Sequence, residues 1–227
     1  MRNPRAFWSF FLIPLIVMYG VPQKAHASES FSNGVLVEEH ASAFSGSGGK
    51  VRSFTISRNG EAMNVSVLSS SLYTTIVTID DQLVIDYSLR YNSSGNAFVD
   101  SATATYNGVS KTIDYAYMQE CTPDTPEQEG ECFMTVPAQE WVNFVDSAMN
   151  SLHSSSFLQA VHDASNEATA QALLGCTVAV LSLAASYVGL WFGCTVGAIT
   201  VVGCVWALVG HATAVVGFGC SCFGKGC

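Results

Sequence analysis

The chain has 227 residues and a formal net charge of −9, from 18 acidic and 9 basic side chains. The acidic residues all lie between Glu29 and Glu167, and beyond Glu167 the only formally charged residue is Lys225. A protein without a basic surface has little to displace the counterions of a phosphate backbone, so this composition argues against nucleic-acid binding.

The first 27 residues are predicted to be a signal peptide. Arg2 and Arg5 precede an apolar run over residues 6–21. Ala25 and Ala27 then provide small residues at positions −3 and −1 of a cleavage site. We therefore expect export with cleavage after Ala27, which gives a secreted protein. An uncleaved N-terminal anchor is the alternative, but the apolar run is short for a bilayer.

Residues 28–50 show no strong pattern and are predicted to be a flexible N-terminal segment. From residue 51 apolar and polar residues alternate, with Asn59-Gly60 and Asn107-Gly108 as hairpin turns. Alternation of this kind buries one face of a sheet and leaves the other wet. We therefore expect an acidic, antiparallel β-meander domain over residues 51–135. Its six predicted strands cover residues 51–57, 63–68, 72–79, 83–91, 98–106 and 109–118.

A helical segment is predicted to follow the meander. Pro137 suits the first turn of a helix. Apolar residues recur at three- and four-residue spacing from Trp141 to Leu152 and, after a serine-rich break, as far as Val161. Residues 136–171 are therefore expected to form an amphipathic helix or a broken pair of helices, ending in a polar linker. Their apolar face is expected to cover that of the meander.

Eight cysteines fall into two even groups, and an exported protein is expected to pair them as disulfides. The first group would close a solvated loop ahead of the helical segment. In the second group Cys220 and Cys222 are too close in sequence to bridge each other comfortably, which predicts different partners for them. The other pairings stay open. The groups are Cys121 and Cys132, and Cys176, Cys194, Cys204, Cys220, Cys222 and Cys227.

Residues 172–227 are apolar and glycine-rich, and residues 175–219 include no Asp, Glu, Lys or Arg. Such a run either crosses a membrane as a hairpin or folds as a small domain held by disulfides. The middle of the run offers nothing for water to solvate, and Lys225 is the single basic residue at its ends. We therefore favour a folded module with short helices over residues 177–187, 196–202 and 205–216. Its composition predicts exposed apolar surface.

The predicted fold class is α+β: an antiparallel β-meander with a covering helix, followed by a small disulfide-stapled all-α apolar module. No catalytic, cofactor-binding or metal-binding motif is found, so no enzyme is predicted. His40 and the other histidines lack metal-ligand spacing. His153 and His162 are expected on a solvated helix face. His211 is expected to be partly buried near the module surface, where a role as a pH-sensitive spot is the alternative.

The layout of an acidic exported part followed by a hydrophobic, cysteine- and glycine-rich end resembles the halocin C8 type of bacteriocin precursor. The runs that carry the resemblance are G-C-T-V at residues 175–178 and 193–196, V-V-G-C at 201–204 and F-G-C-S-C at 218–222. The resemblance implies that the C-terminal part inhibits the growth of related microbes. It also implies that the N-terminal part acts as an immunity or holding domain.

The sequence is therefore interpreted as an exported precursor of a hydrophobic, disulfide-rich, membrane-active antimicrobial peptide. Its expected propeptide cleavage region contains Ala168, Ala170 and Ala172. The expected partners are the target-cell membrane and, as a mask, the protein's own N-terminal domain. Two alternatives remain. One is a membrane-associated surface protein with a C-terminal transmembrane hairpin, and the other is a non-toxic secreted binding domain.

Overall fold

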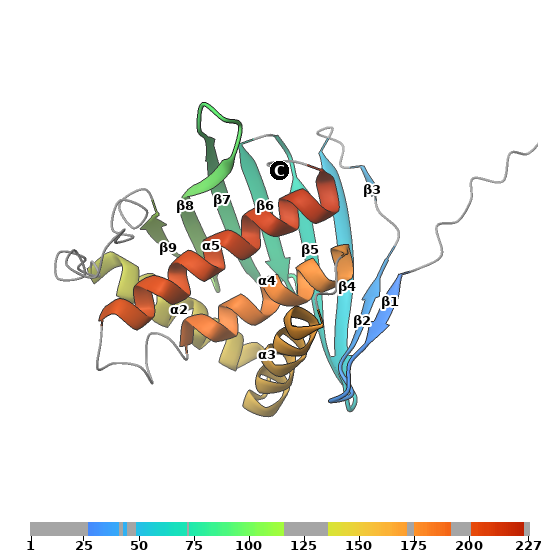
Figure 1. Cartoon of the computed structure of the whole chain (residues 1–227). Helices are drawn as coiled ribbons and strands as arrows, with labels where there is room; N and C mark the ends of the chain where they lie inside the picture. Colours follow the sequence, from blue (N-terminus) through green and yellow to red (C-terminus); the bar gives the residue numbers. More distant parts are fainter. Residues whose placement is uncertain are drawn as a thin grey trace, which may run out of the picture.

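The computed structural model describes residues 27–40, 43–44, 49–71, 73–115, 136–171, 175–191 and 201–224. These residues form two layers, an antiparallel β-sheet and a layer of helices on one of its faces (Figure 1). Several sequence predictions lie outside the described residues. They concern most of the signal peptide with Ala25, the bridge between Cys121 and Cys132, Ala172, Cys194, Cys227 and the side chain of Cys204.

The sheet confirms the predicted meander. From β4 to β9 each strand pairs antiparallel with the next one along the chain. The two edges of the sheet are β1 and β9, and β3 pairs with β4 beside β2. The strands are β1 Ser28–Ser30, β2 Leu36–Glu39, β3 Ala43–Phe44, β4 Lys50–Arg58, β5 Glu61–Ser69, β6 Thr74–Ile79, β7 Leu83–Tyr91, β8 Ala97–Tyr106 and β9 Val109–Asp114.

The turn residues explain why the meander could be predicted. Asn59 and Gly60 between β4 and β5 have φ values of 53° and 84°, and Asn107 and Gly108 between β8 and β9 have 50° and 75°. Positive φ at both central residues defines the two-residue turn whose twist matches paired strands, and Asn-Gly adopts it with little strain. The local sequence therefore fixes the direction of the chain at these two reversals.

The N-terminal segment differs from its prediction as flexible chain, because residues 28–50 contribute β1, β2 and β3. Val37 in β2 pairs with Ile56 in β4, and both side chains are fully buried. The Asn33 side chain donates a hydrogen bond of 2.7 Å to the carbonyl of Ala160. Strands of two to four residues are too short to display alternation, so only their tertiary contacts identify them.

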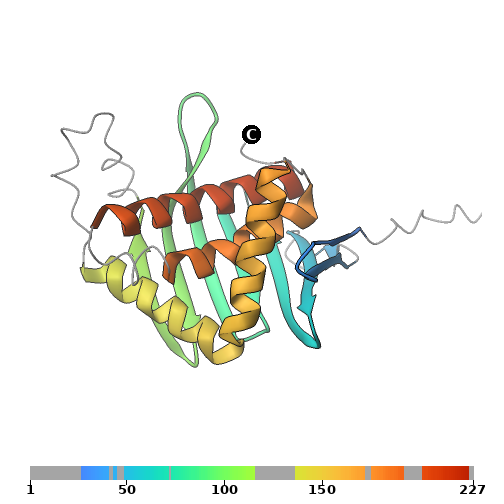
Figure 2. The same cartoon turned by 60° about the horizontal axis from the view of Figure 1, so that its bottom comes forward.

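Four helices cover one face of the sheet: α2 Val136–Leu152, α3 Ser155–Ala170, α4 Cys176–Trp191 and α5 Val201–Phe223 (Figure 2). The predicted broken pair is confirmed, and the hydroxyl of Ser154 caps α3 by accepting a hydrogen bond from the Phe157 backbone. The predicted helix over residues 205–216 is instead part of the longer α5. Burial of its apolar side chains outweighs the low helix propensity of its glycines.

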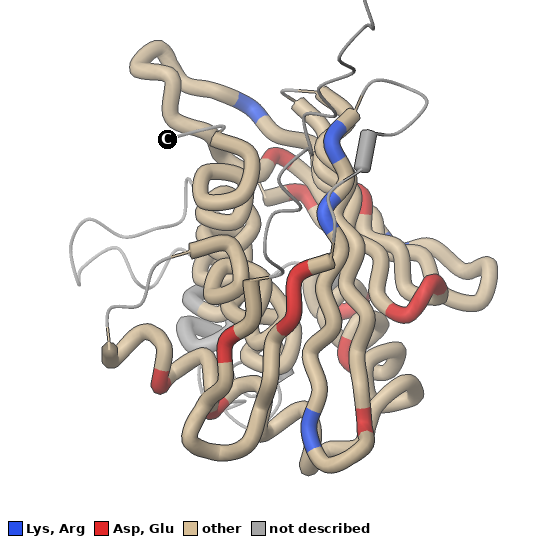
Figure 3. Tube along the Cα trace, turned by 90° about the vertical axis from the view of Figure 1, so that its right-hand side faces the viewer, with Lys and Arg blue, Asp and Glu red and all other residues tan. Residues whose placement is uncertain are grey.

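Helix α4 lies at the centre of the helical layer. It packs against α2, α3 and α5 and also reaches β1, β2 and β4. No residue from Cys176 to Leu190 is exposed. This position accounts for its composition, since a helix that is apolar on every side is stable in water only when neighbours surround it. The chain trace of α4 and α5 carries no acidic or basic residue, whereas the sheet, α2 and α3 carry the charges (Figure 3).

Candidate functional site

The C-terminal hairpin, defined as helices α4 and α5, is closed by its own disulfide. Cys176 at the start of α4 is bonded to Cys222 near the end of α5. Cys220 is also in a disulfide. The prediction that Cys220 and Cys222 have different partners is therefore confirmed. The Cys176–Cys222 bridge joins the two ends of the hairpin to each other and does not tie the hairpin to the sheet.

The apolar side of α5 faces the sheet. Leu208, Ala212, Val215 and Phe218 are buried at three- and four-residue spacing, and the Phe218 ring meets Phe54 of β4 edge-on at 6.0 Å. On its outer side the exposed residues between 207 and 223 are small: Gly210, Thr213, Gly217 and Ser221. The prediction of exposed apolar surface on this module is therefore not met in the described residues, because the rest of the chain covers it.

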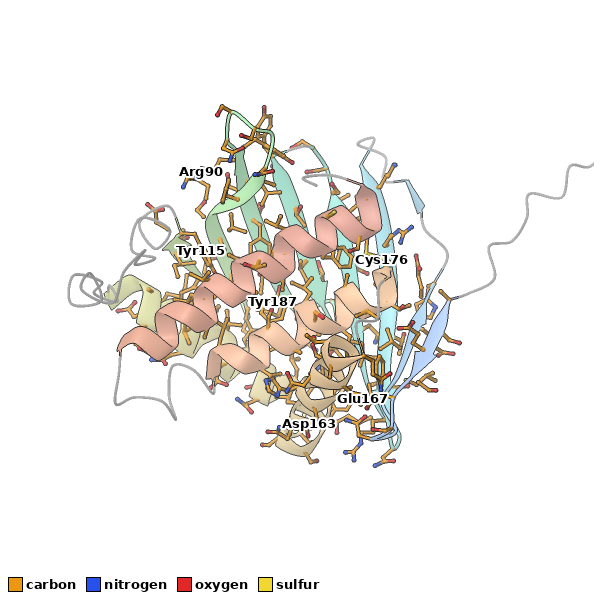
Figure 4. The ribbon with its side chains drawn as sticks, viewed as in Figure 1. Arg90, Tyr115, Asp163, Glu167, Cys176 and Tyr187 are labelled. Carbon is orange, nitrogen blue, oxygen red and sulfur yellow. A yellow bond between two sulfur atoms is a disulfide. The ribbon has the colours of Figure 1, made fainter. Side chains whose placement is uncertain are left out.

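A buried polar network joins the hairpin to the sheet. The Tyr87 hydroxyl of β7 lies 2.8 Å from the Tyr187 hydroxyl of α4 and 2.8 Å from Nε2 of His211 in α5. Nδ1 of His211 lies 2.7 Å from the Ser186 hydroxyl. Figure 4 shows Tyr187 in the region where α4 and α5 lie over the sheet. Two of the described hydrogen bonds between the hairpin and the rest of the protein thus converge on one hydroxyl group.

Counting donors assigns every proton of this network. The Ser186 hydroxyl donates its hydrogen to the Leu183 carbonyl at 2.6 Å, so it must accept from Nδ1 of His211. The neutral imidazole then has Nε2 as an acceptor, and Tyr87 donates to it. The Tyr87 hydroxyl has one hydrogen, which it donates to Nε2 of His211. It must therefore accept in its contact with Tyr187, so Tyr187 donates to the Tyr87 oxygen. The network is complete with a neutral His211 in a single tautomer.

The surroundings of His211 keep it neutral. Its side chain is fully buried, and burial lowers its pKa to about 3. Burial also raises the pKa values of Tyr87, Tyr115 and Tyr187. This corrects the prediction of a partly exposed His211. The reason is that its partner Tyr87 is 124 residues away in the sequence, so no local pattern reveals it.

Two polar groups beside the network have no hydrogen-bond partner among the described residues: the Tyr115 hydroxyl and the Trp141 indole N–H. The rings of Tyr115 and Trp141 lie 6.4 Å and 5.8 Å from the His211 ring. Buried polar groups without partners cost free energy. The site therefore contains two buried tyrosine hydroxyls that can be compared. The Tyr87 hydroxyl takes part in two hydrogen bonds, and the Tyr115 hydroxyl takes part in none among the described residues.

A second cluster ties the junction of α2 and α3 to two turns of the sheet. Nε2 of His153 lies 2.7 Å from Asp80 Oδ2, and its Nδ1 lies 3.7 Å from Glu61 Oε1. Burial acts to raise the pKa of Asp80, but hydrogen bonds from His153 and Asn64 outweigh it and the pKa is lowered. His153 is therefore buried, which corrects its prediction as a solvated residue, while His162 is partly exposed.

The predicted cleavage residues occupy different environments. Ala168 is fully buried inside α3, Ala170 is exposed at its last position, and Gln171 and Gly175 are exposed on either side of residues 172–174. Ala27, the predicted end of the signal peptide, directly precedes β1, and its carbonyl accepts a hydrogen bond from Glu39 at 2.9 Å. Exposed backbone near the predicted propeptide site therefore begins at the end of α3.

Comparison of the chain with known proteins found no relative. No protein-family model, curated protein or solved structure matches this chain. Within the described residues there is no group of three or more His, Cys, Asp or Glu side chains arranged to hold a metal ion. None of the helices in that same part of the chain is both long and apolar enough to cross a membrane. The function is therefore argued from the hairpin and its contacts.

Proposed function

We propose that this protein is the exported precursor of a disulfide-bridged, membrane-active antimicrobial peptide. Residues 28–171 hold the peptide, which contains the C-terminal hairpin, in a folded and water-soluble form until cleavage. The observation that carries the proposal is the burial of an uncharged helical hairpin by the rest of its own chain. The resemblance in layout to the halocin C8 type of precursor points to the same class.

The physical reason for a release step lies in what the hairpin would expose. Burying a Val, Leu or Phe side chain stabilises it by about 1.5–3 kcal/mol relative to water. Val180, Leu181 and Phe218 are among the hairpin residues that the sheet and helices bury. A freed hairpin has no charge from residue 175 to 219 with which to stay solvated. A lipid bilayer would then bury the apolar side chains that the sheet and the other helices bury in the intact protein.

The described disulfide bridge would not hold the two parts together after a cut between them. The Cys176–Cys222 bridge is internal to the hairpin. The described hydrogen bonds between the parts are side-chain contacts, those of Tyr87 and a longer one of 3.4 Å from Ser165 to Ser182. Cleavage between the exposed Gln171 and Gly175 would therefore leave apolar packing as the main force that holds the hairpin.

Mass spectrometry of culture fluid tests this proposal. We expect a fragment that begins within residues 171–175, runs to Cys227 and gains six hydrogens on reduction, because it contains six cysteines. The purified, oxidised fragment is expected to inhibit related strains and to release dye from lipid vesicles. The intact chain is the matched control and should do neither, because its hairpin is covered.

Three results would contradict the proposal. A fragment that neither inhibits any related strain nor permeabilises vesicles would remove the antimicrobial activity. Full-length protein found only with membranes would favour a membrane-anchored protein. Full-length, non-toxic protein in the culture fluid would favour a secreted binding domain.

A further inference from the structure

We propose that protonation of His211 undocks the C-terminal hairpin, so that mildly acidic conditions weaken its attachment to the sheet. The inference concerns the regulation of release, and only its biological use rests on the proposed function. Its basis is the geometry of the buried network, which is complete with a neutral imidazole and offers a charged one no counter-charge among the described residues.

The first argument is that both ring nitrogens of His211 are already committed. Nδ1 donates to Ser186, and Nε2 accepts from Tyr87. A second proton, on Nε2, would point at the hydroxyl hydrogen of Tyr87. Relief requires Tyr87 to turn its hydrogen to the Tyr187 oxygen, 2.8 Å away, and Tyr187 must then withdraw its own hydrogen from that contact. Protonation therefore reverses the two hydrogen bonds that join the hairpin to β7 and leaves the Tyr187 hydrogen without an acceptor among the described hydrogen bonds, which costs free energy.

The second argument is that none of the described residues around His211 carries a charge that could balance an imidazolium. Among the described residues the hydrogen-bond partners and ring neighbours of His211 include no charged side chain. The titratable groups that face it are Tyr87 from β7, Tyr115 after β9 and Tyr187 from α4, while α2 contributes the non-titrating Trp141. The pKa values of the three tyrosines are raised, so all three stay neutral.

The sign of the effect follows from the two states of the hairpin. In the docked state the pKa of His211 is about 3, against an ordinary value of 6.5 when the hairpin is open to water. Below pH 6.5 the open state binds a proton that the docked state does not, so docking weakens as the pH falls toward 3. From pH 6.0 to 4.5 this single proton favours opening by about 25-fold.

A hollow lies beside the outer end of the network. A hollow of about 60 Å³ between α2, α3 and α4 has Tyr187 in its wall, together with the carboxyl residue Asp146 and the polar residues Asn150 and Gln159. Tyr187 is the outer end of the hydrogen-bonded chain that leads to His211. The carboxyls of Glu61 and Asp80 have lowered pKa values and lose their stabilising charge mainly below this pH range. Burial raises the pKa values of the Asp86 and Asp146 carboxyls toward this interval, so the comparison with a His211 variant is needed to separate their effect from that of His211.

Hydrogen–deuterium exchange of the full, oxidised chain tests the proposal. After correction for intrinsic exchange rates, opening of α5 in the natural protein should increase about 25-fold more from pH 6.0 to 4.5 than in His211→Gln, which cannot take up the proton. The control is His162→Gln, on the partly exposed face of α3, which should keep the full pH dependence. Equal slopes in the natural protein and His211→Gln would overturn the proposal.

A measurement on the unmodified sequence keeps the test decisive if His211→Gln does not fold. Nuclear magnetic resonance of ¹⁵N-histidine-labelled protein should show His211 as the Nδ1–H tautomer and neutral down to pH 4.5. Titration of His211 near pH 6.5 in the docked state would refute the inference. Neither readout uses antimicrobial activity. An inactive fragment would contradict the proposed function alone, and docking that does not depend on pH would contradict this inference alone.

Discussion

Replacing both Cys176 and Cys222 with alanine is expected to lower the free energy of unfolding by about 4 kcal/mol. The bridge closes a loop across a sequence separation of 46 residues, and cross-linking so long a loop removes much of the freedom of the unfolded chain. Changing both cysteines also leaves no free thiol from this pair. Urea unfolding of the oxidised protein, followed by tryptophan fluorescence, measures the loss.

Ser221→Ala provides the control, because Ser221 is an exposed residue of α5 beside Cys222. A surface substitution of this kind should change the free energy of unfolding by no more than about 0.5 kcal/mol. A loss below about 1 kcal/mol in the double cysteine variant would show that the bridge does not hold the hairpin together. In that case packing contacts, such as that of Phe218 on Phe54, would be sufficient to hold the two helices in place.

Tyr87→Phe is expected to destabilise the protein by about 2–6 kcal/mol, although it removes a single oxygen atom. The change leaves two buried polar groups without partners, the Tyr187 hydroxyl and Nε2 of His211. Each such group costs about 1–3 kcal/mol when its partner is deleted. Chemical denaturation at pH 7 measures the effect, and exchange data should place the loss in α4 and α5.

Tyr115→Phe is the matched control, since it deletes a hydroxyl that is equally buried but has no hydrogen-bond partner among the described residues. Its cost should be within about 0.5 kcal/mol of zero, or the protein should become slightly more stable. Equal losses for the two phenylalanine variants would mean that the hydrogen bonds of Tyr87 contribute nothing specific to docking.

Local sequence signals predicted the meander and the first two helices well. The alternation of Leu83, Ile85 and Tyr87 places all three on the buried face of β7, as their zero exposure shows. Asn59-Gly60 also marks its turn correctly. These features depend on neighbours within a few residues, where propensity and periodicity carry most of the information. The short strands before β4 lack that information, and they were predicted as flexible chain.

The candidate site could not be assembled from the sequence, because its contacts join residues 100 and 124 positions apart. A signal was nevertheless present. Tyr87 occupies an inward position of its strand, and a buried hydroxyl requires a partner. His211 is the one titratable imidazole in a run without formal charge. Two isolated polar groups in apolar surroundings suggest a pair, but only the fold decides that they meet.

The central position of α4 also determines the order in which this protein can fold. The helix comes from the last quarter of the chain, yet it fills the space between the other helices and the first strands. Until residues 176–191 arrive, α2 can pack on β8 and β9, but α3 and the first strands lack the helix that both of them contact. Contacts between distant residues form slowly. Secondary structure can appear early in this chain, but its tertiary packing is completed from the C-terminal end.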